Sequence, residues 1–144
     1  MTFLNCLSGE ILRNKNEYYS YLQKTRETKD FIPYLKWFVK LLRIAALQST
    51  IRANNVRIAM QEVKHEIRKL DQGMYSQDLV NVLFLGPVVF AKQLVEHHVV
   101  GSISTAHAYL KKLESGGLLN KSERLYTRKV GYINRRLLDA LKAD

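Results

Sequence analysis

The sequence contains few of the residues from which disulfides, metal sites and covalent catalysts are built. Cys6 is the only cysteine among 144 residues, so no disulfide forms within the chain, which suits a reducing compartment. Because Cys6 lies in an apolar run, we expect a small buried side chain rather than a nucleophile. His97 and His98 are adjacent and would point in different directions on a helix. With one cysteine and no His or carboxylate pair four residues apart on a plausible metal-binding face, we predict no metal site.

Targeting segments and nucleotide loops are also absent. The N-terminus lacks the basic region and sustained apolar run of a signal peptide. The longest apolar stretches fall well short of the roughly 20 residues that cross a membrane. The seven glycines are scattered and form neither of the common phosphate-binding loops. We therefore predict a cytoplasmic protein without membrane association, without a bound cofactor and without a complete catalytic constellation in this chain.

Positive charge is what the chain has in excess. The formal net charge is +10, and residues 1–70 contribute 13 Lys and Arg against 6 acidic residues. Because the excess is not confined to one segment, it is compatible with nucleic acid, with acidic proteins and with membrane surfaces. A hydrophobic content of 47% and a charged content of 25% are ordinary for a globular protein of one domain or two small ones.

Residues 1–70 are predicted to be helical throughout. The first two helices are expected over Ser8–Asn14, with Ser8 as the N-cap, and over Asn16–Lys24. Asp30 can cap a third helix, in whose first turn Pro33 is tolerated. Apolar residues recur at helical spacing at Phe31, Tyr34, Leu35, Phe38, Leu41, Leu42 and Ala45. No breaker precedes Leu70, so this helix could extend over about 40 residues, or about 60 Å.

The second half of the long helix has a narrow apolar seam with heptad-like spacing. The seam consists of Val56, Met60, Val63, Ile67 and Leu70. Two heptads fall below the three or four that indicate a coiled coil. The sequence leaves two interpretations: a helix that docks on the second domain of its own chain, and a helical dimer seam.

Residues 71–75 form the only plausible linker, and a second helical segment follows it. Ser76 can cap a helix over Gln77–Phe84 that buries Leu79, Val82 and Leu83, and Gly86-Pro87 ends it. Val88-Val89 is expected to form a short strand. The predicted domains are therefore residues 1–70, the linker 71–75 and residues 76–144.

The most informative pattern in the chain lies between residues 90 and 133. Helices are expected over Phe90–His97 and Ser102–Ser115, joined by a tight apolar turn at Val99-Val100-Gly101. A two-strand ribbon follows from Leu118 to Ile133, broken by polar residues around Ser122–Thr127. This order is typical of a winged helix-turn-helix. The predicted fold class is mainly α, with a helical segment followed by a winged helix domain that carries a small β-ribbon.

The second of these helices has the features of a DNA recognition helix. Ile103, Ala106, Leu110 and Leu113 would face the core, and Gly116-Gly117 would stop the helix in left-handed conformations. The predicted DNA-binding residues are Ser102, Ser104, Thr105, His107, Ala108, Lys111 and Lys112 on the helix, with Arg124, Arg128 and Lys129 on the wing. The same fold also serves as a protein-docking and dimerisation unit, and the predicted face lacks Arg, Asn and Gln. Double-stranded DNA and a protein partner therefore both remain open.

Residues 7–38 carry a second pattern. It comprises Leu7-Ser8, Arg13-Asn14-Lys15-Asn16-Glu17-Tyr18-Tyr19, Leu22, Arg26 and Asp30-Phe31-Ile32-Pro33-Tyr34-Leu35-Lys36-Trp37-Phe38. The stretch resembles a block that follows the catalytic motif of Fic family proteins, with Phe31 and Tyr34 where the family usually has Trp. A long helix and a winged helix-turn-helix follow that block in a common bacterial subgroup.

The resemblance implies a relation to protein AMPylation and also a missing part. Fic proteins typically transfer AMP from ATP onto a hydroxyl side chain of a target protein, through a loop H-P-F-x-x-G-N-G-R-x-x-R that does not occur here. It therefore implies a truncated or split protein, non-enzymatic by itself, that would use ATP only with the missing Fic core supplied. Helices that normally pack on that core would expose Tyr18, Tyr19, Leu22, Trp37 and Phe38. Self-association or binding to a Fic catalytic core is then expected.

Overall fold

The computed structural model describes residues 3–126 and 129–142, with the side chains of residues 7–122 and 130–142. The chain divides into two compact units, Met1–Ala53 with Asp144, and Asn54–Ala143. The boundary between the units lies inside one helix, whereas the sequence places the domain limits at residues 70 and 76. The predicted domain limits at residues 70 and 76 stay a prediction.

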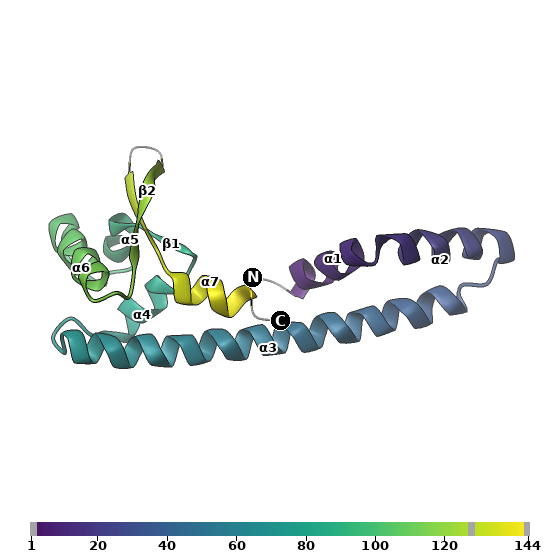
Figure 1. Ribbon diagram of the computed structural model, residues 1–144, viewed down its shortest axis with the longest axis horizontal. Helices are drawn as coiled ribbons and strands as arrows, with labels where there is room; N and C mark the ends of the chain where they lie inside the picture. The colour runs from purple at the N-terminus through teal and green to yellow at the C-terminus, as the bar shows by residue number, and fades with distance from the viewer. Residues whose placement is uncertain (1–2, 127–128, 143–144) are drawn as a thin grey trace. The chain divides into compact units, whose positions relative to one another are not determined.

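The described residues form a mainly helical protein with a small antiparallel sheet of three strands (Figure 1). The elements are α1 (Phe3–Arg13), α2 (Lys15–Thr28), α3 (Ile32–Leu70), α4 (Gln77–Leu83), β1 (Val88–Val89), α5 (Ala91–Glu96), α6 (Ile103–Ser115), β2 (Asn120–Tyr126), β3 (Lys129–Ile133) and α7 (Arg135–Lys142). None of the helices formed by residues 3–126 and 129–142 has an apolar stretch sufficient to span a bilayer.

Local signals set the helix limits in the first unit. The Ile32 N–H donates to Asp30 Oδ1 at 2.9 Å, which confirms the predicted start of α3 and places Pro33 in its first turn. The prediction of Ser8 as an N-cap is wrong, because α1 begins at Phe3 and no breaker separates that residue from Ser8. α2 also extends past Lys24, and ends where Lys29 adopts a left-handed conformation with φ of 60°.

An aromatic cluster joins α2 to the first half of α3. Trp37 is 8% exposed, and its ring lies 5.5 Å from the stacked ring of Tyr21. Its Nε1 donates to Glu17 Oε2 at 2.8 Å, so the indole N–H keeps a partner although the ring is buried. Of the side chains expected to be exposed, Tyr19 is exposed, Trp37 is buried, and the other three (Tyr18, Leu22 and Phe38) are half-buried, because they pack within the unit.

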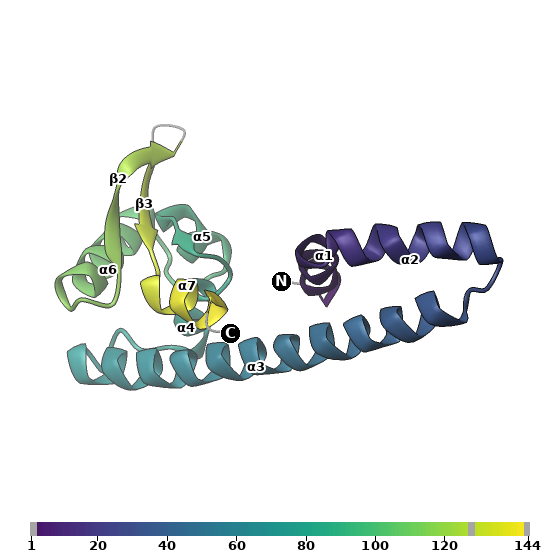
Figure 2. The same cartoon turned by 45° about the vertical axis from the view of Figure 1, so that its right-hand side comes forward.

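The core of the second unit is built from the second half of α3, from α4 to α6 and from the sheet. Its fully buried members include Ile67, Leu79, Leu94, Leu110 and Leu119. The strand order is β1-β3-β2, and Val88 pairs with Ile133 across the β1–β3 ladder. Figure 2 shows β2 and β3 running side by side away from α7. The predicted strand at Val88-Val89 is confirmed.

The helix starts of this unit follow the predicted caps. The Leu79 N–H donates to Ser76 Oγ at 3.0 Å, and the Thr105 N–H donates to Ser102 Oγ at 3.2 Å. α5 begins one residue later than predicted, and the Phe90 N–H donates to Gln93 Oε1 at 2.8 Å.

The ends of α5 and α6 have the same hydrogen-bond pattern. After α5, His98 N–H donates to Val95 O and Val99 N–H donates to Leu94 O, with His98 at φ 55°. After α6, Gly117 takes the same place at φ 74°. Both are Schellman motifs, in which glycine is the usual left-handed residue, so His98 is the unusual member of the pair.

Gly116 serves a different purpose from the one predicted for it. Its φ is −79°, so only Gly117 of the glycine pair is left-handed. A Cβ at Gly116 would lie 2.8 Å from Leu70 Cδ2, so the absence of a side chain permits close packing of α6 on the end of α3.

Two further expectations are wrong. Ile103 is 50% exposed, and β2 continues through Ser122 to Tyr126, because the backbone hydrogen bonds of an antiparallel ladder do not require apolar side chains.

α7 is not among the predicted elements. Asn134, 1% exposed, starts it: its Oδ1 accepts from Leu137 N–H, and its Nδ2 donates to the carbonyl oxygen of Leu83 at 2.9 Å. One Nη of Arg136 donates to both carboxylate oxygens of Glu66 at 2.7 Å. These contacts hold α7 against α3 and α4 within the second unit.

Candidate nucleic-acid interface

The outward face of α6 is the best candidate for a nucleic-acid interface. Ala106, Leu110 and Leu113 are fully buried and fix the orientation of the helix. The side chains of Ser104, His107, Ala108 and Lys111 are exposed and recur at a spacing of three or four residues, so they lie on one face. A small side chain between polar ones permits close approach to base edges in a major groove.

The hydroxyl groups at the start of α6 are already hydrogen-bonded to one another. Ser102 Oγ lies 2.9 Å from Ser104 Oγ and 2.8 Å from Thr105 Oγ1. Ser102 Oγ also accepts from the Thr105 N–H and so uses its full capacity, because a hydroxyl can donate once and accept twice. The hydroxyls of Ser104 and Thr105 keep capacity for a further partner. The cluster therefore presents a pre-arranged polar surface at the helix N-terminus, where backbone N–H groups favour an anion.

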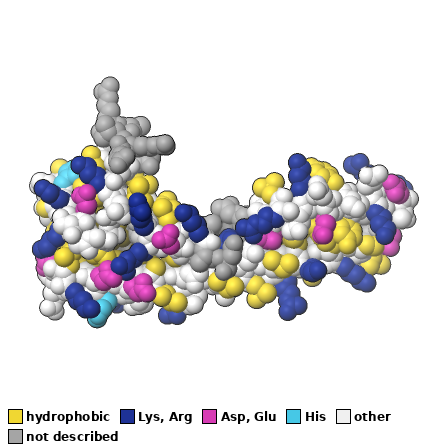
Figure 3. Space-filling view, in the orientation of Figure 1, with side chains coloured by type: hydrophobic (Ala, Val, Ile, Leu, Met, Phe, Trp, Pro, Cys, Tyr) yellow, Lys and Arg dark blue, Asp and Glu magenta, His cyan; other side chains and the backbone are white. Residues whose placement is uncertain are grey.

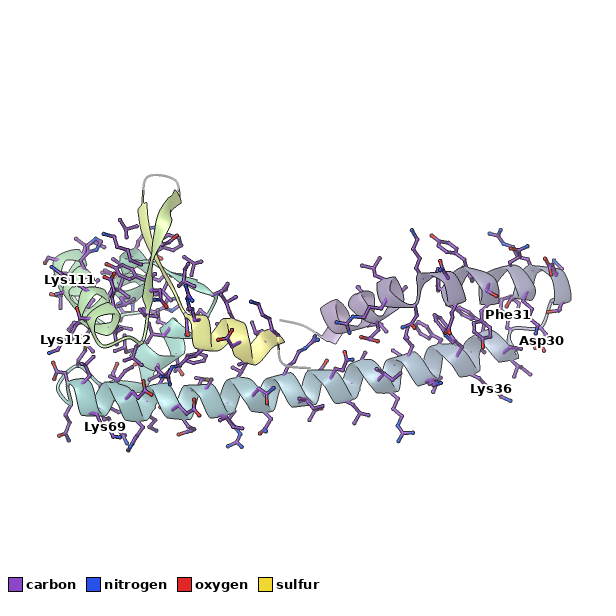
Figure 4. All side chains as sticks on the ribbon, viewed as in Figure 1. Asp30, Phe31, Lys36, Lys69, Lys111 and Lys112 are labelled. Atoms are coloured by element: carbon purple, nitrogen blue, oxygen red, sulfur yellow. The ribbon has the colours of Figure 1, made fainter. Side chains whose placement is uncertain are left out.

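Lys112 forms an ion pair within the chain, whereas the sequence predicts that its side chain contacts DNA. Its Nζ lies 2.6 Å from Asp71 Oδ2 in the connection that follows α3. Asp71 Oδ1 accepts from the Gly73 N–H at 2.9 Å, so one carboxylate serves both the turn and the ion pair. The hydrogen bond from Lys112 and then that from Gly73 lower the pKa of Asp71. Figure 4 shows Lys111 and Lys112 next to each other on α6.

The predicted wing cannot be placed in full. Arg128 lies outside the described residues, and the side chains of Arg124 and Lys129 lie outside the described side chains. The backbone of β2 and β3 is antiparallel, with Tyr126 opposite Lys129, so the ribbon itself is present. The side chain of Cys6 also lies outside the described part.

The predicted seam on α3 lies mainly inside the second unit. Val63 and Ile67 belong to its buried core, and Met60 and Leu70 pack against that core. Val56 is half-buried. The packing favours the docking interpretation, since a dimer seam would need side chains that already contact their own chain.

Sequence reasoning missed Asp71 as a residue that organises this surface. Asp71 two residues before Gly73 is a recognisable turn signal, but its partner lies 41 residues away and no local pattern indicates it. Among the residues that the structure describes, no group of three or more His, Cys, Asp or Glu side chains could hold a metal ion.

Comparison with protein families identifies the chain. The second unit is mainly helical with a three-stranded sheet, and it leaves one face of α6 exposed. A family model described as the C-terminal domain of SoFic-like protein adenylyltransferases matches residues 59–137, which lie within the second compact unit. The chain therefore belongs to this family. No curated protein matches the chain significantly.

Proposed function

We propose that the second unit is a winged helix-turn-helix domain that binds double-stranded DNA through α6, as a non-catalytic part of a Fic-type protein. The single observation that carries the proposal is the outward face of α6. Its inner side is locked into the core, and its outer side presents small and polar side chains beside Lys111. α5 and α6, joined by a tight turn, are the arrangement in which the second helix enters the major groove.

The residues have distinct proposed roles. Lys111 contacts a phosphate and positions the helix, while Ser104 and His107 meet base edges. The charged contacts are few, so a single copy binds with modest affinity and a shallow dependence on salt. The chain by itself is proposed to carry out no adenylylation, and its use of ATP would require a Fic core.

Fluorescence anisotropy with a labelled duplex tests the DNA proposal. Lys111→Ala should weaken binding and reduce the slope of log Kd against log salt by about 0.9, the contribution of one phosphate contact. The matched control is Lys36→Ala, which removes the same charge from the other compact unit and should leave the slope unchanged. Equal losses in both variants would mean that binding follows net charge and not α6.

A second candidate function is protein interaction, and a specific observation favours it. The first unit exposes large apolar side chains on α3 and just before it, among them Phe31, Leu35 and Val39 at 53 to 62% exposure. Contiguous exposed apolar side chains commonly mark an interaction site. We propose that this unit pairs with a Fic catalytic core or with a second copy.

A further inference from the structure

The first half of α3 is apolar on two opposite faces. Trp37, Leu41 and Ala45 form its buried face toward α2. On the opposite side five large apolar side chains are 48 to 62% exposed: Ile32, Leu35, Val39, Leu47 and Ile51. We call these five residues the outer stripe. A helix that is apolar all round is normally buried on every side, so the outer stripe indicates a missing neighbour.

The same side of α3 changes character along its length. Beyond Ala53, exposed polar residues prevail on this side, including Arg57, Gln61, His65 and Arg68, although Ile58 is also 45% exposed. The stripe from Ile32 to Ile51 covers 20 residues, or about 30 Å of helix. Its limited extent indicates a partner segment of about that length.

The charges beside the outer stripe indicate the chemistry of that partner. Lys36, Lys40 and Arg43 are exposed and interleave with its apolar residues, and no acidic residue occurs from Phe31 to Gln61. Figure 3 shows hydrophobic and basic side chains next to each other over this part of the surface, and Figure 4 labels Lys36 on the first half of α3. A second copy paired through the same stripe would place these cations against each other, at a cost from like-charge repulsion.

We propose that the outer stripe docks a different polypeptide, whose surface is apolar and flanked by acidic side chains. This inference rests on the protein-interaction candidate of the proposed function and selects a partner other than a second copy. Burial of the stripe supplies the affinity, and the three cations select the partner and set its orientation.

Two designed helical peptides test the inference with the full chain. Both carry the same apolar stripe, one flanked by Glu and the other by Lys. The Glu-flanked peptide should bind about tenfold more tightly, since about three exposed ion pairs contribute modestly each. The charge-reversed variant Lys36→Glu/Lys40→Glu should reverse this preference. Val39→Asp should abolish binding, whereas Gln61→Asp, on the polar part of the same side of α3, should leave it unchanged.

Each other outcome overturns the inference. Equal binding of both peptides, or binding of neither, would show that the outer stripe does not select an acid-flanked partner. A dimer in sedimentation experiments that Val39→Asp converts to a monomer assigns the stripe to a second copy. Binding to vesicles that contain phosphatidylserine, lost in Val39→Asp, assigns it to a membrane surface. DNA binding is measured separately through Lys111→Ala, so the failure of either proposal is distinguishable from failure of the other.

Discussion

The ion pair between Lys112 and Asp71 leads to a prediction with an unusual direction. Asp71→Asn should increase the affinity of the chain for DNA, because Lys112 is held by an internal carboxylate at 2.6 Å and would be released. The substitution is nearly isosteric and keeps the Oδ1 acceptor that the Gly73 N–H uses at 2.9 Å, so the turn after α3 should persist. Only the negative charge is lost.

The magnitude follows from one additional phosphate contact. Release of Lys112 should steepen the slope of log Kd against log salt by about 0.9, so the advantage of Asp71→Asn should shrink about 3.5-fold between roughly 50 and 200 mM salt. Fluorescence anisotropy across a salt series measures this slope. The control is the double variant Asp71→Asn/Lys112→Ala, in which the gain should be absent.

The reasoning is refuted if Asp71→Asn leaves the slope unchanged, or if the double variant retains the full gain. A separate check concerns the ion pair itself. The pKa of folded Asp71 lies below its usual value of 3.8, so its contribution to stability is present above that pH. This contribution should be lost as the pH falls below 3.8 and through the lower pKa of the folded state. Urea titrations of Asp71→Asn at several pH values should lack this pH-dependent part of the stability.

Two further predictions concern stability and are measured by urea denaturation. Ile67→Ala should lower the free energy of unfolding by about 3 to 4 kcal/mol, because Ile67 is fully buried. The loss of three buried carbon groups accounts for about 2.4 kcal/mol, and the cavity that they leave accounts for the rest. Ile58→Ala, at 45% exposure, should cost less than about 1 kcal/mol, and similar values for both would contradict the core described here. Gly117→Ala should cost about 1 kcal/mol, whereas His98→Gly at the matching position should stabilise by up to about 1 kcal/mol, since both residues have positive φ. A loss on His98→Gly would mean that the imidazole makes a compensating contact.

Much of the fold could be predicted because its signals are local. Asp30 and Pro33 mark the start of α3, and Ser76 and Ser102 cap the helices that follow them. The buried side of α6 follows from the spacing of its apolar residues. The start of α1 is less predictable, since helix-compatible residues on both sides of Ser8 give no unique boundary.

The candidate site was less predictable because its contacts are long-range. The spacing of residues on α6 correctly places Lys112 on the solvent side of the helix. It cannot show that the ammonium group of Lys112 forms an ion pair with Asp71. In the first unit the periodicity of α3 identifies a broad apolar helix, but it does not show which side of that helix α2 covers. The sequence therefore could not predict that Trp37 is buried and Leu35 is exposed. α7 had a usable signal, Asn134 before Leu137 and Leu138, which marks a helix start of the ordinary kind.

Asn134 also has a consequence for the order of events during synthesis. Its side chain donates to the carbonyl oxygen of Leu83, 51 residues earlier in the chain, and its own N–H donates to the carbonyl oxygen of Pro87. While a ribosome still holds residue 134, α4 and β1 have emerged but lack these bonds. The second unit therefore closes only after residue 134 has left the ribosome, and until then its edges are open to chaperones or to a partner chain.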